Sequence, residues 1–116
     1  MFQHSSNSVI KAAKIQKQEN EAQLEVIKNQ TQSQLQSLFV VLQKDRKNIS
    51  YYKESGLPQS DLLLQQAQRG FQEGEIGYIE YVQGLNRALT IQVRYLEFLN
   101  QYNQTLINIE QLIKTN

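Results

Sequence analysis

The 116-residue sequence carries twelve Lys and Arg against eleven Asp and Glu, and the resulting net charge of +1 argues against a dedicated nucleic-acid-binding protein. One proline and five glycines are too few for a β-sandwich or barrel, whose turns recur about every 8–12 residues. The absence of cysteine excludes disulfides and thiolate ligands, and no apolar run approaches the roughly 18 residues of a membrane-spanning helix, so composition favours an all-α chain.

The first predicted helix runs from about residue 9 to residue 55 and is rich in Gln, Lys, Glu and Leu, which are good helix formers. Its apolar positions recur at steps of three and four, close to a sustained heptad. This seam is Leu24, Ile27, Thr31, Leu35, Leu38, Leu42, Asp45, Ile49 and Tyr52. The first thirty residues contain few large apolar side chains, so we expect that stretch to fray or to need a partner.

A break is predicted where the chain reads Ser55-Gly56-Leu57-Pro58. Glycine commonly ends a helix and proline fits the first turn of the next, so a second helix is expected over about 58–73. Two arrangements remain open. The first arm can continue past a kink at Gly56–Pro58, as one arm of a long antiparallel coiled-coil-like hairpin, or it can fold back there into a compact three-helix bundle.

The second turn is predicted at Gly74, between Glu73 and Glu75, and a third helix is predicted over about 76–114. Apolar residues cover an arc of roughly 200° of this helix, wider than the single seam of a two-stranded coiled coil. We therefore expect it to contact more than one neighbour. The residues expected to pack are Leu85, Leu89, Tyr95, Leu96, Leu99, Tyr102 and Leu106. The predicted fold is one all-α domain over residues 1–116.

No catalytic, cofactor-binding or metal-ligating set is apparent, and an enzyme is not expected. Glu73, Glu75 and Glu80 cluster at the second turn, but a catalytic carboxylate pair needs a water-excluding pocket that separates the two pKa values. The glycines of this turn do not match a phosphate-binding loop. The cluster is either a solvated acidic tip or a tip that faces a partner or cations.

A resemblance to a known family appears in the segment 67–83, which reads Ala-Gln-Arg-Gly-Phe-Gln-Glu-Gly-Glu-Ile-Gly-Tyr-Ile-Glu-Tyr-Val-Gln. It resembles the A-x-x-x-[YF]-x-x-G-E pattern of TolC-type outer-membrane efflux proteins. Gly56-Leu57-Pro58 upstream, and Tyr95-Leu96-Glu97 and Tyr102-Asn103-Gln104 downstream, are also similar to that family. The nearest variety is fused to the C-terminus of heavy-metal efflux pumps of the resistance–nodulation–division superfamily. The resemblance covers roughly residues 10–113.

The resemblance implies that the chain is the helical part of the family's second repeat, within a larger polypeptide of a Gram-negative cell envelope. Family members form trimeric helical tunnels across the periplasm, which conduct substrates passively while the pump supplies energy. The implied cargo is heavy-metal cations. The implied partners are the pump and a periplasmic adaptor, with self-association through the helices. The tip that would meet the adaptor comprises Phe71, Gln72, Glu73, Gly74, Glu75 and Ile76.

A second hypothesis is a helical interaction or scaffold module with no role in transport. The glutamine-rich first helix and its heptad-like seam motivate it. The parent reading frame separates the two hypotheses, because only a transport component is expected beside membrane spans and a pump domain. We expect the chain to self-associate at high concentration, since apolar stripes of this width usually acquire partners.

Overall fold

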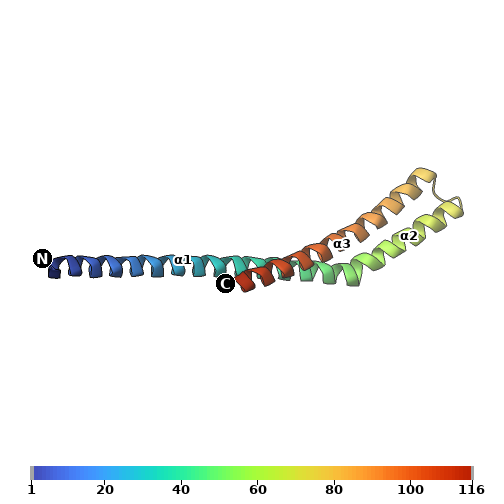
Figure 1. Ribbon diagram of the computed structural model, residues 1–116. Coiled ribbons are helices and arrows are strands. Elements are labelled where there is room, and N and C mark those ends of the chain that lie inside the picture. The colour runs from blue at the N-terminus through green and yellow to red at the C-terminus, as the bar shows by residue number, and fades with distance from the viewer. Residues whose placement is uncertain (1, 116) are drawn as a thin grey trace. The chain divides into compact units, whose positions relative to one another are not determined.

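The computed structural model describes the backbone of residues 2–115 and the side chains of residues 4–115. Its elements are α1 (Phe2–Tyr51), the π-helical turn η1 (Tyr52–Gly56), α2 (Leu57–Gln72) and α3 (Tyr78–Thr115) (Figure 1). Residues 2–115 contain no strand, so the all-α prediction is confirmed. None of the helices in this range is long and apolar enough to cross a membrane.

The chain divides into two compact units, residues 1–37 and residues 38–116, which are described separately. In the first unit α1 is already helical at Phe2, so the predicted start near residue 9 is too late and the expected fraying is not seen. Side chains 4–30 are all exposed, including apolar Val9, Leu24 and Ile27. The predicted need of this stretch for a partner remains a prediction.

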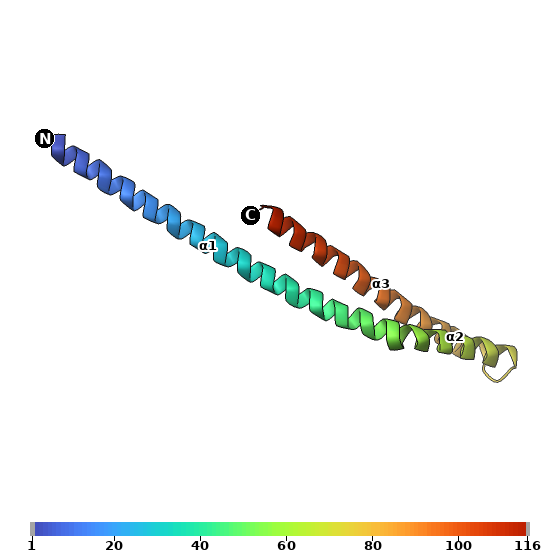
Figure 2. The ribbon, with the colours of Figure 1, turned by 90° about the horizontal axis from the view of Figure 1, so that it is seen from below.

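The second unit is an antiparallel hairpin in which α2 and α3 are joined by the turn 73–77, as both ribbon views show (Figures 1 and 2). On one face of α3, residues recur at alternating intervals of three and four along the whole helix, and every one of them is buried or half-buried. This inner seam is Tyr81, Gly84, Ala88, Ile91, Tyr95, Phe98, Tyr102, Thr105, Ile109 and Leu112. The first arm contributes Leu38, Leu42, Asp45, Ile49 and Tyr52. The long hairpin is confirmed.

The chain stays helical through Ser55–Pro58, so the helix ends predicted there are wrong, whereas the predicted kink in a continuous first arm is confirmed. Gly56 has φ −63° and ψ −50°, and Leu57 has φ −65° and ψ −44°, so neither residue reverses the chain. The compact three-helix bundle is therefore excluded. Instead, the Leu57 N–H donates to the carbonyl of Tyr52, five residues back, which defines a π turn. In Figure 1 the first arm changes direction at this turn.

Two features of the sequence account for the π turn, which is wider than a turn of α-helix. Asp45 and Tyr52 are seven residues apart, as are Ser60 and Ala67, but eight residues separate Tyr52 from Ser60. The π turn takes up the extra residue, so that all four side chains face α3. Pro58 is the second feature, since a proline ring clashes with the carbonyl four residues earlier in a regular α-helix.

The register of the hairpin is fixed by three contacts along its length. The rings of Tyr52 and Phe98 lie 5.6 Å apart, and the Ser60 hydroxyl donates to the Ala88 carbonyl at 2.9 Å. Nearer the tip, Gly84 lies directly against Ala67, since a Cβ built on the glycine would be 2.8 Å from the Ala67 Cβ. Small residues therefore bring α2 and α3 together closely.

Gly84→Ala is expected to destabilise the hairpin by about 1 kcal/mol. A new methyl group against Ala67 costs roughly 1–3 kcal/mol by overpacking, and removing glycine from a helix interior returns up to about 1 kcal/mol. Gly77→Ala is the matched control, because nothing lies within 4 Å of a Cβ at that position. Thermal unfolding followed by circular dichroism measures both. A higher melting temperature for Gly84→Ala would show that the helices do not approach closely.

Candidate functional site

The tip of the hairpin is formed by a glycine-terminated helix end of the Schellman type. Gly74 has φ +74°, the left-handed conformation that glycine adopts without strain. The Glu75 N–H donates to the Gly70 carbonyl at 2.8 Å, and the Gly74 N–H donates to the Phe71 carbonyl at 3.2 Å. These two bonds satisfy carbonyls that the end of α2 would otherwise leave free. The predicted bend at Gly74 is confirmed.

The predicted start of the third helix at residue 76 is two residues early, because Ile76 belongs to the turn. Its N–H also donates to the Gly70 carbonyl, at 3.2 Å. Its side chain covers Gly70, where a Cβ would lie 3.2 Å from Ile76 Cγ1. The absence of a side chain at Gly70 thus leaves room for the Ile76 side chain to pack against the end of α2.

Aromatic side chains stiffen the tip on the α3 side. Phe71 stacks on Tyr81 with ring centroids 4.7 Å apart and an angle of 17°, and it meets the Tyr78 ring edge-on at 6.2 Å. Such pairs add about 0.5–1.5 kcal/mol beyond their buried area. Tyr78 and the adjacent Ile79 nevertheless remain about 70% exposed, at 68% and 72%. The tip therefore offers an apolar surface on a rigid support.

The carboxylates of Glu73, Glu75 and Glu80 surround this surface and are exposed. Glu80 lies in the first turn of α3, where the helix dipole favours a negative charge. Within residues 4–115 the one ion pair joins Lys114 and Glu110, so none of the three tip carboxylates is neutralised by a salt bridge. No cluster of three or more metal-ligating side chains occurs in the described part of the chain. The tip thus combines exposed carboxylates with exposed apolar side chains.

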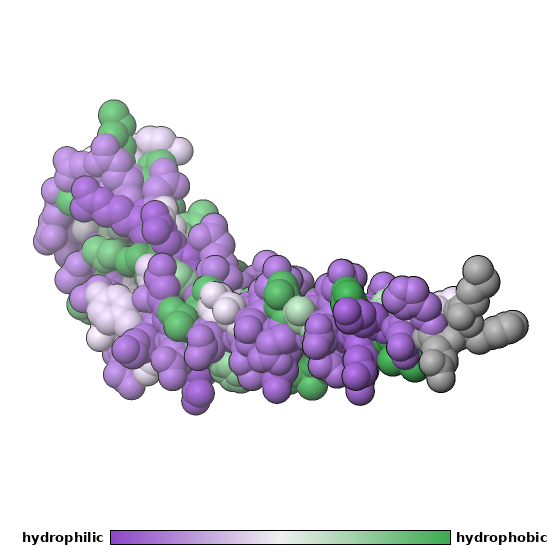
Figure 3. All heavy atoms as spheres, turned by 90° about the vertical axis from the view of Figure 1, so that its left-hand side faces the viewer, coloured by the Kyte–Doolittle hydropathy of each residue, from purple (hydrophilic) through white to green (hydrophobic). Residues whose placement is uncertain are grey.

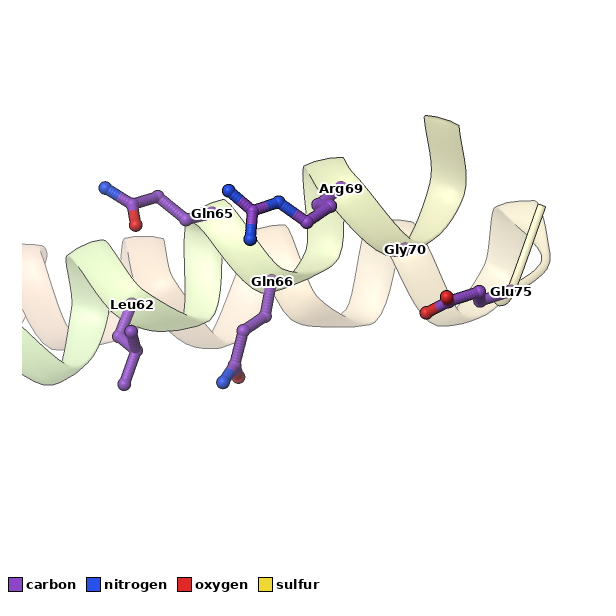
Figure 4. Close-up of a pocket in the computed structure, with 6 residues that line it drawn as sticks. All are labelled: Leu62, Gln65, Gln66, Arg69, Gly70 and Glu75. Atoms are coloured by element: carbon purple, nitrogen blue, oxygen red, sulfur yellow. The ribbon is translucent and has the colours of Figure 1, made fainter. Parts of the chain in front are cut away.

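Two open grooves lie beside α2 near the tip. One, of about 310 Å³, is lined by Leu62, Gln65, Gln66, Arg69, Gly70 and Glu75. Figure 4 shows the Arg69 guanidinium extending along α2 toward Gln65, with Gln66 and Leu62 on the other side. The second groove, of about 340 Å³, lies on the α3 side and includes Glu80 and Arg87. Glu75 was predicted as part of the tip, whereas neither Arg69 nor Arg87 was predicted to line a groove.

The structure separates the predicted helix-packing residues into two groups. Tyr95 and Tyr102 belong to the inner seam, and Leu85 and Leu99 are half-buried beside it. The other three residues are exposed at 56%, 60% and 40%, and they are Leu89, Leu96 and Leu106. These three side chains do not pack within the hairpin. Their packing against another chain remains a prediction.

These exposed leucines belong to a second heptad on α3, which we call the outer seam. It runs through Leu85, Leu89, Gln92, Leu96, Leu99, Asn103, Leu106, Glu110 and Ile113, again at steps of four and three. The first arm covers the inner seam and partly buries Leu85, Gln92 and Leu99 of the outer seam. Figure 3 shows apolar residues, in green, interrupting the hydrophilic surface of the molecule. Helix α3 thus has one apolar face within the hairpin and a second, adjacent one on which Leu89, Leu96 and Leu106 are exposed.

Three polar side chains are buried between the two arms, namely Asp45 and Ser60 on the first arm and Thr105 on the inner seam. Ser60 is fully buried, donates to the Ala88 carbonyl and accepts a hydrogen bond from Gln92 Nε2 at 3.2 Å. Asp45 is 1% exposed, and its Oδ2 has no hydrogen-bond partner. Asp45 lies seven residues before Tyr52, and Thr105 lies seven residues after Phe98. The antiparallel register therefore places these two buried polar side chains opposite each other.

Comparison with known proteins identifies no relative, since no family model, curated protein or solved structure matches the chain.

Proposed function

We propose that the chain is part of the helical wall and tip of an envelope efflux duct, with the tip 71–76 as the docking element for a periplasmic adaptor. The observation that carries the proposal is the pair of seams on α3. A helix with two adjacent heptad faces packs between two neighbours, as helices do in a curved wall, whereas a two-stranded coiled coil uses one face. The resemblance of residues 67–83 to TolC-type proteins supports the same reading.

The tip suits a docking role because it combines rigidity with exposed contact groups. The hydrogen bonds at Gly70 and Gly74 and the Phe71–Tyr81 stack hold the turn in one conformation. Preorganisation of this kind lowers the entropic cost of binding. Exposed Tyr78 and Ile79 supply apolar area, and the carboxylates around them attract cations or basic side chains. In a trimer this negative potential would be repeated around one axis.

The test replaces the tip carboxylates in the full-length protein that contains this chain, as Glu73→Gln, Glu75→Gln and Glu80→Gln together. We expect weaker co-purification of the adaptor and severalfold lower tolerance of heavy-metal cations, because the substitutions remove the negative field without changing side-chain size. The matched control substitutes three exposed carboxylates of α1, as Glu19→Gln, Glu21→Gln and Glu25→Gln. Unchanged adaptor binding and unchanged tolerance in the tip variant would overturn the proposed docking role.

The alternative function, a scaffold module without transport, uses the same outer seam but does not need the tip. It predicts that the tip variant behaves as the unmodified protein and that a parent reading frame lacks a pump domain and membrane spans. The two functions are therefore distinguished at the tip rather than along the helices.

A further inference from the structure

We infer that the outer seam of α3 binds the outer seam of a second copy of this chain, with the two helices antiparallel. The inference does not rest on the proposed function, since it concerns only the outer seam, in which Leu85, Gln92 and Leu99 are half-buried beside the first arm and three leucines are exposed. Leu89, Leu96 and Leu106 expose 40–60% of their surface on that face. Apolar surface of this extent on a helix is normally covered by a partner.

The sequence of the outer seam is complementary to itself when reversed. With a two-fold axis between Leu96 and Leu99, Leu96 meets Leu99 of the second copy. One layer outward, Gln92 meets Asn103, and in the next layer Leu89 meets Leu106. Leucine thus meets leucine and amide meets amide in both directions from the axis. A two-fold interface requires this kind of self-complementarity, and an amide layer fixes the register of a coiled coil.

The length and charge of the face also suit a second copy. From Leu85 to Glu110 the seam spans 26 residues, or about 39 Å and more than three heptads, which is enough for a coiled coil. Among the seam residues of this span only Glu110 is charged, and it pairs with Lys114 at the edge of the contact, opposite Leu85 of the second copy. No like charges therefore meet in the interior of the interface.

In-register parallel pairing is less favourable, because it would bring the two Glu110 carboxylates together. A neighbouring wall helix would cover the same face in an efflux duct. The antiparallel pair and the wall contact are thus two occupants of one surface.

The absence of native cysteine allows a direct test by cross-linking. We expect Leu89→Cys and Leu106→Cys chains, when mixed under mild oxidation, to form the mixed disulfide. Neither variant alone should form a disulfide dimer, because 17 residues, about 25 Å, separate the two positions along the helix. Homodisulfides of each variant alone would demonstrate parallel pairing and overturn the inference. The absence of all disulfides would overturn it as well.

Sedimentation equilibrium supplies the second measurement. The unmodified chain of 13.5 kDa is expected to form a dimer, and Leu89→Glu with Leu96→Glu should raise the dissociation constant at least tenfold. Gln101→Glu with Gln104→Glu adds the same charge on the exposed polar face and is the control. A strictly monomeric unmodified chain, or equal weakening by both variants, would contradict the inference. The tip variant should dimerise normally, so failure here is distinguishable from failure of the docking role.

Discussion

Deleting Glu54 together with Pro58→Ala is expected to leave the hairpin folded, although a deletion inside a helix is normally disruptive. The deletion shortens the Tyr52–Ser60 spacing from eight residues to seven, so a regular α-helix can replace η1 and keep both side chains on the inner seam. The proline is replaced in the same variant, because its ring would cost about 3 kcal/mol in a regular helix. We expect a melting temperature within a few degrees of the unmodified chain.

The matched control deletes Gln65 in the same Pro58→Ala background. Gln65 is also an exposed polar residue of the first arm, but its loss rotates Ala67 and Gly70 by about 100° relative to Ser60. The contacts Ala67–Gly84 and Gly70–Ile76 cannot then form together with Ser60–Ala88. The cost is several kcal/mol, or a fall of roughly 10 °C or more in melting temperature. If both deletions lowered the melting temperature equally, η1 would not be the turn that accommodates the extra residue.

Asp45→Leu is expected to stabilise the hairpin, by about 2 kcal/mol. A buried carboxylate with an unpartnered oxygen carries a desolvation cost that no hydrogen bond offsets, and replacement of buried charged groups by packed apolar ones often gains roughly 1–4 kcal/mol. Leucine also fits a position between Leu42 and Ile49 on the seam. Thermal or urea unfolding measures the gain, which corresponds to roughly 10 °C in melting temperature.

The control for this substitution is Asp61→Leu, at an exposed position of α2 where no comparable cost is relieved. Its effect on the free energy of unfolding should stay within about 0.5 kcal/mol. A lower melting temperature for Asp45→Leu would mean that the Asp45 carboxylate has a stabilising partner in solution. Stabilisation by leucine would instead identify Asp45 as a residue retained for a reason other than the stability of this hairpin.

The hairpin itself could be predicted because its signals are local. Gly74 between two glutamates marks a turn, and long stretches of helix-forming residues on both sides leave no other secondary structure. The seam residues Leu38–Tyr52 were predicted from steps of three and four and are buried or half-buried as expected. Leu24 and Ile27 continue the same spacing, but their side chains are exposed, because no other helix packs against them.

The choice of packing residues on α3 could not be made from size and hydrophobicity. Both of its seams have heptad spacing and large side chains, which are aromatic on the inner seam and mostly leucine on the outer seam. The first arm covers the seam that contains Gly84, Ala88 and Thr105, because small side chains allow the closest approach of two helices. The inner seam could have been identified from the small residues on both arms, such as Ala67 and Gly84, because they allow the two helices to approach closely.

The π turn was missed because Gly56-Leu57-Pro58 is also a typical helix-ending sequence. Local propensity alone cannot separate the two cases. The eight-residue interval from Tyr52 to Ser60 is one residue longer than a heptad, and it indicates a π turn. The interval could not be interpreted from the sequence, because it is informative only when Tyr52 and Ser60 are known to face the same helix.

The π turn also determines where the long arm yields mechanically. Pro58 has no N–H to donate, so the backbone ladder is one bond short beside η1, and the exposed side chains of Lys53 and Glu54 leave that side of the arm open to water. Small fluctuations of the helix axis should therefore concentrate there, while the aromatic contact between Tyr52 and Phe98 limits their amplitude. Under an applied force, we expect the helical segments before and after η1 to stay straight and the arm to bend at η1, which would act as a hinge.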